Sequence, residues 1–299
     1  MRIASKLTNL IDPVKSEIMA SNDLSTILDA EWGFFSEVLA SQKGLSEEQK
    51  VIFRAETVEC RRERLSQFLF SKLNGRVAYG PFTGLELDPT PAWGKTDLSS
   101  MLLGVYELQV LNALHSPEFS DRNHFVDIGA ADGYYAVGCL HNGRFKTADC
   151  FEIREIGRET IKRNAKLNGV ADKVRIFGAA DASLPSLLKE IDWSDTVILC
   201  DIEGAELDLF DPTFLAAIKG AIILIEIHNW VEDFWPRYVE LLKCASKDYE
   251  LRFLESSALP RQHLPELRGM TDDNRMLILS EGRPNVMRFL QLISRDGTR

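Results

Sequence analysis

The chain has 299 residues, of which 45% are hydrophobic and 27% charged, and its formal net charge is −10. This composition is ordinary for a globular protein, and the length is sufficient to bury a core without disulfides. The acidic balance disfavours a nucleic-acid partner, because such a surface repels a phosphate backbone. No apolar run approaches the ~18 residues that a membrane-spanning helix needs, and no apolar secretory segment is visible, so we expect a cytoplasmic protein with no membrane partner.

The cysteines form no recognisable ligand or disulfide pattern. There are five, without a C-x-x-C pair, and an odd, scattered set disfavours both a disulfide framework and a zinc cluster. Cys150 and Cys200 lie in apolar runs, where we expect buried and inert thiols.

The first hundred residues are expected to form a helical extension followed by an irregular linker. Helices are predicted at residues 23–40 and 45–75, where apolar residues recur at helical spacing. Residues 77–100 are rich in Gly, Pro and Asp, which is typical of irregular structure and of a boundary. Residues 1–100 are then a lid, an element of a homodimer or simple packing, and residues 101–299 are expected to form the main domain.

After a helix predicted at 102–116, short apolar runs alternate with helical stretches. Strands are expected at residues 124–130, 148–153, 174–179, 196–202, 221–227, 249–255 and 274–280. Continuous apolar runs such as VILC and IILI are typical of strands buried on both faces. The alternation predicts an α/β fold with a Rossmann-like, doubly wound sheet, in which a ligand binds beyond the carboxyl ends of the strands.

The segment VDIGAADGYYAVG at residues 126–138 is the strongest candidate for a cofactor loop. Gly129 and Gly133 allow sharp turns, and the small Ala131 lets a ligand approach the backbone. The spacing is not the G-x-G-x-x-G of pyrophosphate-binding loops, and an acid stands inside the loop. Carboxylates such as Asp127 suit a ligand with a positive charge, and Tyr134 could present a ring face to it. A plain strand-to-helix turn is the alternative.

Two further acids follow the next two strands. Glu152 ends the second strand about 20 residues after the loop, where an acid can accept hydrogen bonds from ribose hydroxyls. Asp181 follows the third strand and could accept from an adenine amino group or cap the next helix. Upstream of the loop, Tyr106 and Glu107 could close over the other end of the cofactor.

These motifs, with CDIEGAELDLF and IEIH further on, resemble the FkbM-type branch of class I methyltransferases over residues 124–229. The resemblance implies a seven-stranded sheet whose last strand is antiparallel. It also implies S-adenosylmethionine as cofactor and O-methylation of a small molecule or sugar hydroxyl, with Asp127, Gly129 and Gly133 in the cofactor loop and Glu152 on the ribose. Ala131 stands where many methyltransferases have glycine.

The ends of the fourth and fifth strands carry the candidate catalytic residues. Asp201 and Glu203 are two apart and face one side of the strand, toward the pocket, where Asp201 is also assigned to the cofactor. His228 follows the fifth strand. Either His228 or a carboxylate is a general base for an acceptor hydroxyl, or some of these residues hold a divalent metal, or Glu203 caps a helix and His228 is a satisfied polar residue. We favour the base and expect no metal.

The sequence therefore predicts a methyltransferase that acts on a small-molecule acceptor. An NAD-dependent oxidoreductase is the first alternative, although G-x-G-x-x-G is missing. A nucleic-acid methyltransferase is disfavoured, because DIEG stands where many such enzymes carry D/N-P-P-Y/F. A non-catalytic binding or scaffold protein with the same fold is the third alternative.

Overall fold

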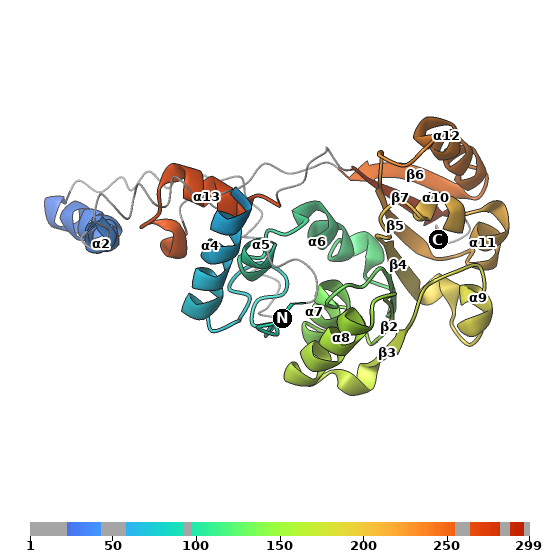
Figure 1. Ribbon diagram of the computed structural model, residues 1–299, viewed down its shortest axis with the longest axis horizontal. Coiled ribbons are helices and arrows are strands. Elements are labelled where there is room, and N and C mark those ends of the chain that lie inside the picture. The colour runs from blue at the N-terminus through green and yellow to red at the C-terminus, as the bar shows by residue number, and fades with distance from the viewer. Residues whose placement is uncertain (1–22, 43–57, 92–96, 255–263, 282–287, 296–299) are drawn as a thin grey trace.

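The computed structural model describes residues 23–42, 58–91, 97–254, 264–281 and 288–295. Its centre is a seven-stranded sheet of order β3-β2-β1-β4-β5-β7-β6 (Figure 1). Only β7 runs antiparallel to its neighbours β5 and β6. The strands are β1 His124–Ile128, β2 Thr147–Phe151, β3 Val174–Phe177, β4 Thr196–Cys200, β5 Ile222–Ile227, β6 Tyr249–Leu254 and β7 Arg288–Ser294. The predicted fold class is confirmed.

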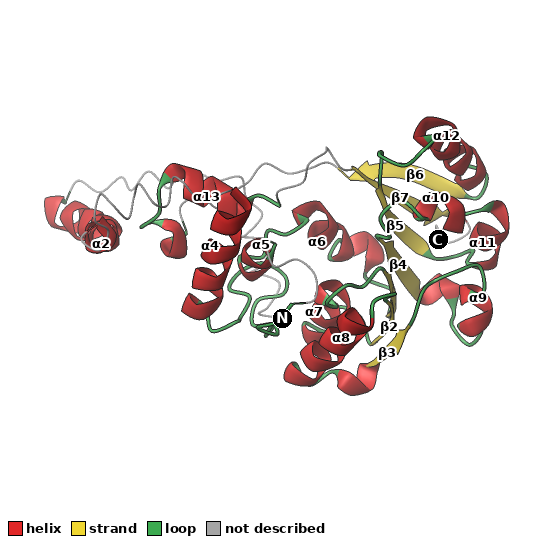
Figure 2. Ribbon diagram, in the orientation of Figure 1, coloured by secondary structure: helices red, strands yellow, loops and turns green. Residues whose placement is uncertain are grey.

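Helices cover both faces of the sheet (Figure 2). Adjacent residues of a strand face opposite sides, so Phe125 and Leu199 belong to one core and Val126 and Ile198 to the other. The described helices are α2 Leu24–Gln42, α4 Val58–Lys72, α5 Leu98–Leu102, α6 Leu108–Leu114, α7 Tyr134–His141, α8 Glu155–Leu167, α9 Leu184–Leu187, α10 Glu206–Leu209, α11 Pro212–Ala217, α12 Phe234–Ala245 and α13 Asp272–Leu279. None of them is both long and apolar enough to cross a membrane.

The prediction of a strand at residues 274–280 is wrong, because this segment lies within and just after α13. A short apolar run such as MLIL does not distinguish a buried helix from a strand. The helical signal lies just before it, where the Oγ1 atom of Thr271 accepts a hydrogen bond from the backbone of Asn274 (3.4 Å), and acids occupy the first turn. The last strand of the sheet is β7 instead.

A smaller lobe stands beside the sheet and is built from α4, α5 and α13 (Figure 1). The buried Arg62 of α4 ties it together, donating to Asp97 (3.2 Å) and to the carbonyl of Ser280 (2.9 Å). The expected boundary after residue 100 falls inside α5, and α13 comes from the part assigned to the main domain. The chain thus crosses between sheet and lobe more than once.

The predicted N-terminal helices are found in part. α2 and α4 match two of the predicted stretches, while residues 45–57 lie outside the described residues. The predicted helix at 102–116 is interrupted between α5 and α6, at Gly104 (φ +61°) and Glu107 (φ 42°). A Cβ atom on Gly104 would lie 2.0 Å from the carbonyl oxygen of Tyr79, so this turn brings two backbones into contact.

Candidate active site

A cavity of about 280 Å³ opens beyond the carboxyl ends of β1, β2 and β4. The strand order reverses between β1 and β4, which is where doubly wound sheets bind ligands. Five of the predicted site residues line it: Gly129, Ala131, Glu152, Asp201 and Glu203. The other lining residues are Ile128, Phe151, Ile153, Arg154, Ala179, Ala180, Ile202 and Ala205.

Gly129 allows the ends of β1 and β4 to meet. Its φ is +88°, and a Cβ atom there would lie 1.7 Å from the carbonyl oxygen of Asp201. The amides of Gly129 and Ala130 donate to the carbonyl of Phe151 at 2.9 and 3.0 Å, which joins the loop to β2. Ala131 also has a left-handed backbone (φ 47°), a conformation that L residues other than glycine adopt at a cost of roughly 1 kcal/mol. The part of the cavity wall formed by Gly129 and Ala131 is thus mainly backbone, with positive φ at both residues.

Glu152 is fixed at the edge of the cavity by backbone amides. It is 7% exposed, and its two carboxylate oxygens accept from the amides of Ala131 (2.9 Å) and Arg154 (2.7 Å). Gly157 on α8 makes room for it, because a Cβ atom there would lie 2.6 Å from Cγ of Glu152. Each oxygen can accept a second hydrogen bond, so the carboxylate suits a ligand that presents hydroxyls.

Asp127 lies behind the cavity and not in its wall. Burial, together with the nearby carboxylates of Asp201, Glu152 and Glu107, raises the pKa of Asp127 to about 8, although a hydrogen bond from the Ala136 amide opposes the shift. The side chain is therefore mostly a neutral acid at pH 7. It is a weaker counter-charge for a cationic ligand than the sequence suggested.

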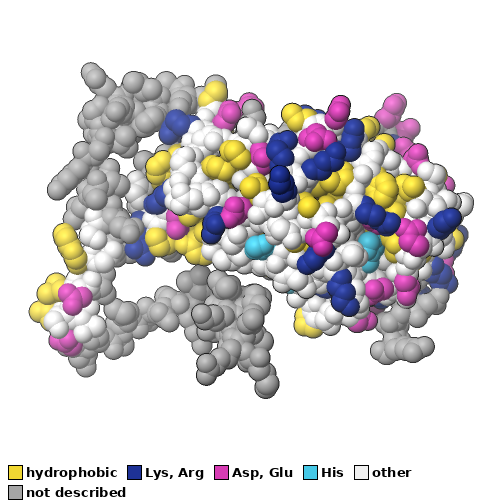
Figure 3. Space-filling view, turned by 90° about the horizontal axis from the view of Figure 1, so that it is seen from below, with side chains coloured by type: hydrophobic (Ala, Val, Ile, Leu, Met, Phe, Trp, Pro, Cys, Tyr) yellow, Lys and Arg dark blue, Asp and Glu magenta, His cyan; other side chains and the backbone are white. Residues whose placement is uncertain are grey.

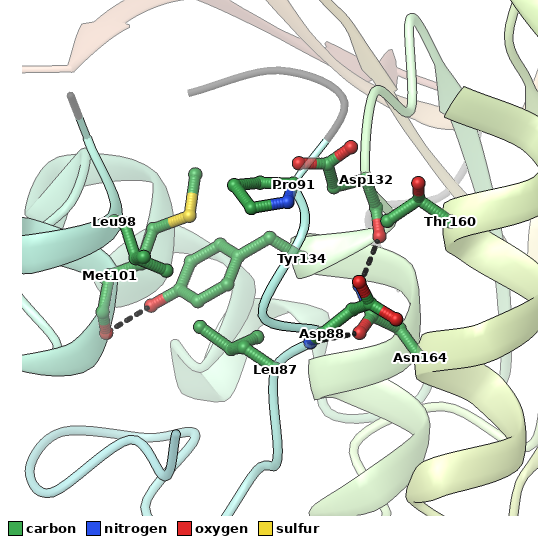
Figure 4. A pocket seen from close by; sticks show the side chains of 9 residues that line it. All are labelled: Leu87, Asp88, Pro91, Leu98, Met101, Asp132, Tyr134, Thr160 and Asn164. Carbon is green, nitrogen blue, oxygen red and sulfur yellow. Dashed lines mark hydrogen bonds between the residues drawn. The ribbon is translucent and has the colours of Figure 1, made fainter. Parts of the chain in front are cut away.

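Three other predicted cofactor residues lie outside the cavity wall. The Tyr134 hydroxyl donates to the carbonyl of Met101 (3.4 Å), as Figure 4 shows. The Tyr134 ring packs edge-on against Phe82. Gly133 begins α7 and packs against Ile161. Asp181 is exposed and accepts from the Ser183 amide (2.8 Å) in a local turn, while the N-cap of α9 is Ser183, so Asp181 does not cap that helix either. The structure thus places the aromatic ring and the third acid differently from the prediction.

His228, Asp201 and Glu203 do come together, as the strand positions predicted. The Nε2 atom of His228 lies 3.3 Å from Asp201 and 3.8 Å from Glu203, and Glu226 is 3.6 Å away. On its other side, Nδ1 lies 3.0 Å from Oε1 of Glu206. The imidazole is only 1% exposed and has carboxylates on both sides.

This environment argues against the general-base role expected for His228. Burial disfavours the charged ring, but the carboxylates of Asp201 and Glu206 outweigh it and raise the pKa of His228 to about 9. At neutral pH the ring is an imidazolium and cannot accept a proton. The sequence argument used an unperturbed pKa and did not anticipate Glu206.

Glu206 is the site residue that sequence reasoning missed. It is fully buried in α10, and its Oε2 atom accepts from the Gly204 amide (2.8 Å) while Oε1 faces His228. The N-cap of α10 is Ala205, so the helix-capping role considered for Glu203 is not found there, and Glu206 is the first residue of this helix. The sequence feature that could have indicated Glu206 is the segment DIEGAE at residues 201–206. It places this second glutamate in the first turn of a helix, close to the end of β4.

Two sets of described residues have the spacing of an ion site: Asp201, Glu203 and His228, and Glu107, Asp201 and Glu226. A histidine must be neutral to bind a metal, so an ion in the first set would have to displace the proton of His228. The imidazolium supplies one positive charge to this acidic cluster, and the absence of a metal stays an expectation from sequence.

Glu107, which the sequence placed near the cofactor, is buried beside the same cluster. Its carboxylate accepts from the Tyr135 hydroxyl at 2.5 Å, and its amide donates to Glu281 at 2.8 Å. The segment before β1 therefore does reach the carboxyl edge of the sheet.

Neither a protein-family model nor a curated protein matches the chain. Among solved structures, the METTL16 methyltransferase domain is 14% identical and covers 80% of each chain at a TM-score of 0.48. A putative tRNA (m1A22) methyltransferase from Streptococcus pneumoniae is 14% identical, with 58% of this chain and 65% of its own covered and a TM-score of 0.37. Precorrin-6y C5,15-methyltransferase from Geobacter metallireducens is 18% identical, with 49% and 73% covered and a TM-score of 0.37.

The chain thus spans slightly less than two thirds of the Streptococcus protein. These similarities concern the fold alone, and the interpretation of the site depends on this chain's own residues.

Proposed function

We propose that this protein is an S-adenosylmethionine-dependent methyltransferase. The observation that carries the proposal is the cavity at the β1/β4 switch point, bounded by Gly129, Ala131 and Glu152. Its volume of about 280 Å³ is close to the lower end of small-ligand pockets. The FkbM-type resemblance supports the same cofactor.

The charge of the cavity favours a cationic nucleoside over a dinucleotide. Glu152, Asp201 and Glu203 line it, with Arg154 as a basic residue. Three carboxylates would repel a pyrophosphate and attract a sulfonium or an ammonium. Glu152 is already oriented for ribose hydroxyls by two amides. This arrangement disfavours the NAD-dependent alternative.

We further propose that the acceptor is a hydroxyl of a small molecule or sugar. S-adenosylmethionine, when bound, supplies a methyl group attached to a positively charged sulfur. After transfer of the methyl group this sulfur is a neutral thioether. The protein then has to hold the acceptor oxygen in line with that group and receive its proton. Glu203 is 55% exposed at the mouth of the cavity and is the carboxylate best placed to take the proton, while the imidazolium of His228 holds Asp201 in position.

The partners expected from the sequence stay proposals. Acidic and basic side chains are interspersed on the face shown in Figure 3, so this face offers no uniformly basic surface to a phosphate backbone. α2 exposes Leu24, Leu28 and Trp32, a surface compatible with a homodimer. A cytoplasmic location is an expectation from sequence.

Binding of S-adenosylhomocysteine tests the proposal, measured by calorimetry and thermal shift with NAD as comparison. At 100 times Kd the ligand should stabilise the protein by about 2.7 kcal/mol. Glu152→Ala should weaken this binding, whereas Glu159→Ala, which removes an exposed glutamate of α8, should not. Binding of NAD alone would favour an oxidoreductase, and binding of neither at millimolar concentration would favour a non-catalytic protein.

The acceptor atom needs a separate experiment. S-adenosylmethionine labelled with carbon-13 in its methyl group can be incubated with the protein and a panel of hydroxylated and amino compounds. The chemical shift of the transferred carbon distinguishes an oxygen acceptor from a nitrogen acceptor. Transfer to amines alone would overturn the O-methylation proposal while leaving the cofactor proposal intact.

A further inference from the structure

The segment before the sheet, residues 75–88, lies across α7 and α8 as a strap. It folds back on itself through backbone hydrogen bonds from Val77 to Leu85 (2.9 Å) and from Leu87 to Gly75 (2.9 Å). Phe82 of the strap packs on α7 directly over Gly138, where a Cβ atom would lie 2.5 Å from the ring. Both helices that flank the cofactor loop are therefore in contact with a segment from outside the sheet.

Asn164 of α8 and Asn168, the C-cap residue of that helix, hold the far end of this strap. Asn168 exchanges two hydrogen bonds with the backbone of Glu86, at 2.9 and 2.8 Å. One turn earlier, Asn164 accepts from the amide of Asp88 at 2.8 Å. The side-chain amides thus make hydrogen bonds to the backbone of residues 86 and 88 that a neighbouring strand would otherwise make.

Asn164 also reaches the cofactor loop, which Asn168 does not. Its Nδ2 atom donates to the carbonyl oxygen of Asp132 at 2.8 Å (Figure 4). The next amide, of Gly133, donates to the carbonyl of Ala130 at 2.6 Å, so the peptide group between Asp132 and Gly133 is held at both ends. Asn164 is 4% exposed, and water does not readily replace its hydrogen bonds.

The loop needs such support because its backbone is unusual. Gly129, Ala131 and Gly133 all have positive φ; glycine adopts such a conformation readily, but at Ala131 it persists only where the surroundings impose it. Glu152 holds the loop from the cavity side through Ala131, and Asn164 holds it from the opposite side through Asp132.

We propose that Asn164 is a positioning residue that sets the shape of the cofactor loop and couples it to the strap. The proposal rests on the proposed function, since the ligand held by the loop is taken to be S-adenosylmethionine. Ordering of the loop by a ligand then orders residue 88, and loss of the Asn164 donor weakens ligand binding without any contact between Asn164 and the ligand.

A matched pair of substitutions at the C-terminal end of α8, one in the helix and one at its C-cap, tests this. Asn164→Asp removes the donor and places a carboxylate against the Asp132 carbonyl, and we expect Kd for S-adenosylhomocysteine to rise about tenfold or more. Asn168→Asp makes the same change at a strap contact that lacks the loop bond, and its Kd should stay within about twofold of wild type. Equal Kd values for Asn164→Asp and wild type would overturn the positioning role of Asn164. Equal weakening of S-adenosylhomocysteine binding by both variants would overturn it too.

A measurement on the wild-type protein keeps the test independent of how the variants fold. Saturating S-adenosylhomocysteine should slow amide hydrogen exchange at Asp88 about fivefold, because its acceptor is Asn164, and should change Glu86 much less. Unchanged exchange at Asp88 overturns the coupling. Absence of any binding by the wild type instead overturns the proposed function itself.

Discussion

The Nδ1 atom of His228 lies 3.0 Å from Oε1 of Glu206, and both side chains are almost entirely buried. The same glutamate oxygen also accepts from the His228 backbone amide at 3.1 Å. This pair fixes the ring so that Nε2 faces Asp201 and the cavity. The orientation of His228 is therefore fixed by a residue of the helix that follows β4, and Asp201 and Glu206 together favour its positive charge.

The first prediction is that His228 titrates near pH 9. Burial opposes protonation, and the Asp201 and Glu206 carboxylates outweigh it. An NMR titration of the ring protons, with the His228 resonance assigned from its absence in His228→Gln, measures this pKa directly. A midpoint at or below the ordinary value of 6.5 would restore the general-base interpretation.

The same shift predicts how stability depends on pH. The folded pKa of about 9 is above the ordinary value of 6.5, so the folded state binds the proton more tightly than the unfolded state. The resulting stabilisation, of the order of 3 kcal/mol, is complete below pH 6.5 and is lost as pH rises through 9. Urea unfolding between pH 6 and 10 should show this loss in wild type and not in His228→Gln.

Asp127→Asn should stabilise the protein increasingly as pH rises. Burial raises the pKa of this carboxyl from 3.8 to about 8, so the unfolded chain releases the proton at a lower pH than the folded chain does. Wild type therefore loses stability between about pH 4 and 8, by several kcal/mol at most, and the neutral amide does not.

Unfolding of both proteins at pH 5 and pH 8 checks the Asp127 prediction. The difference between them should widen at the higher pH. Asp172→Asn, at an exposed aspartate, serves as the control and should show no such widening. A constant difference between Asp127→Asn and wild type would mean that Asp127 is ionised in the folded protein.

The sequence predicted the sheet and the gathering of acids at its edge for a simple reason. Parallel strands end at one edge, so Asp201 after β4 and His228 after β5 had to meet if those strands were neighbours. The order of β4 and β5 and the cavity beyond β1 fulfil that condition. Local periodicity was sufficient for these features.

Other features depend on contacts between segments distant in sequence. Asn164 meets residues 32 and 76 positions away, and no local pattern distinguishes it from an ordinary polar helix residue. Tyr134 is absent from the cavity wall and contacts Phe82 and the Met101 carbonyl, which lie 52 and 33 positions away in the sequence. The prediction made from the apolar run in α13 was wrong because four consecutive apolar residues suit either a helix or a strand.

Gly129→Ala should be far more damaging than Gly143→Ala. Both glycines have positive φ, +88° and +75°, so both substitutions incur roughly 1 kcal/mol of backbone strain. A Cβ atom on Gly143 meets nothing within 4 Å, whereas one on Gly129 would lie 1.7 Å from the Asp201 carbonyl oxygen. Denaturant unfolding should show a loss of about 3 kcal/mol or more for Gly129→Ala. Similar losses for the two variants would show that the ends of β1 and β4 separate easily.

The last prediction concerns the strap's contact with α7. Alanine normally stabilises a helix relative to glycine by up to about 1 kcal/mol, but at Gly138 the added methyl would lie 2.5 Å from the Phe82 ring. We expect Gly138→Ala to destabilise the protein by about 1–3 kcal/mol through overpacking. Gly33→Ala in α2, where nothing lies within 4 Å, should not lower stability. In a Phe82→Ala background the penalty of Gly138→Ala should disappear, because the ring it collides with is gone. A penalty that persists without the ring would place its origin in α7 itself, and the strap would then not press on this helix.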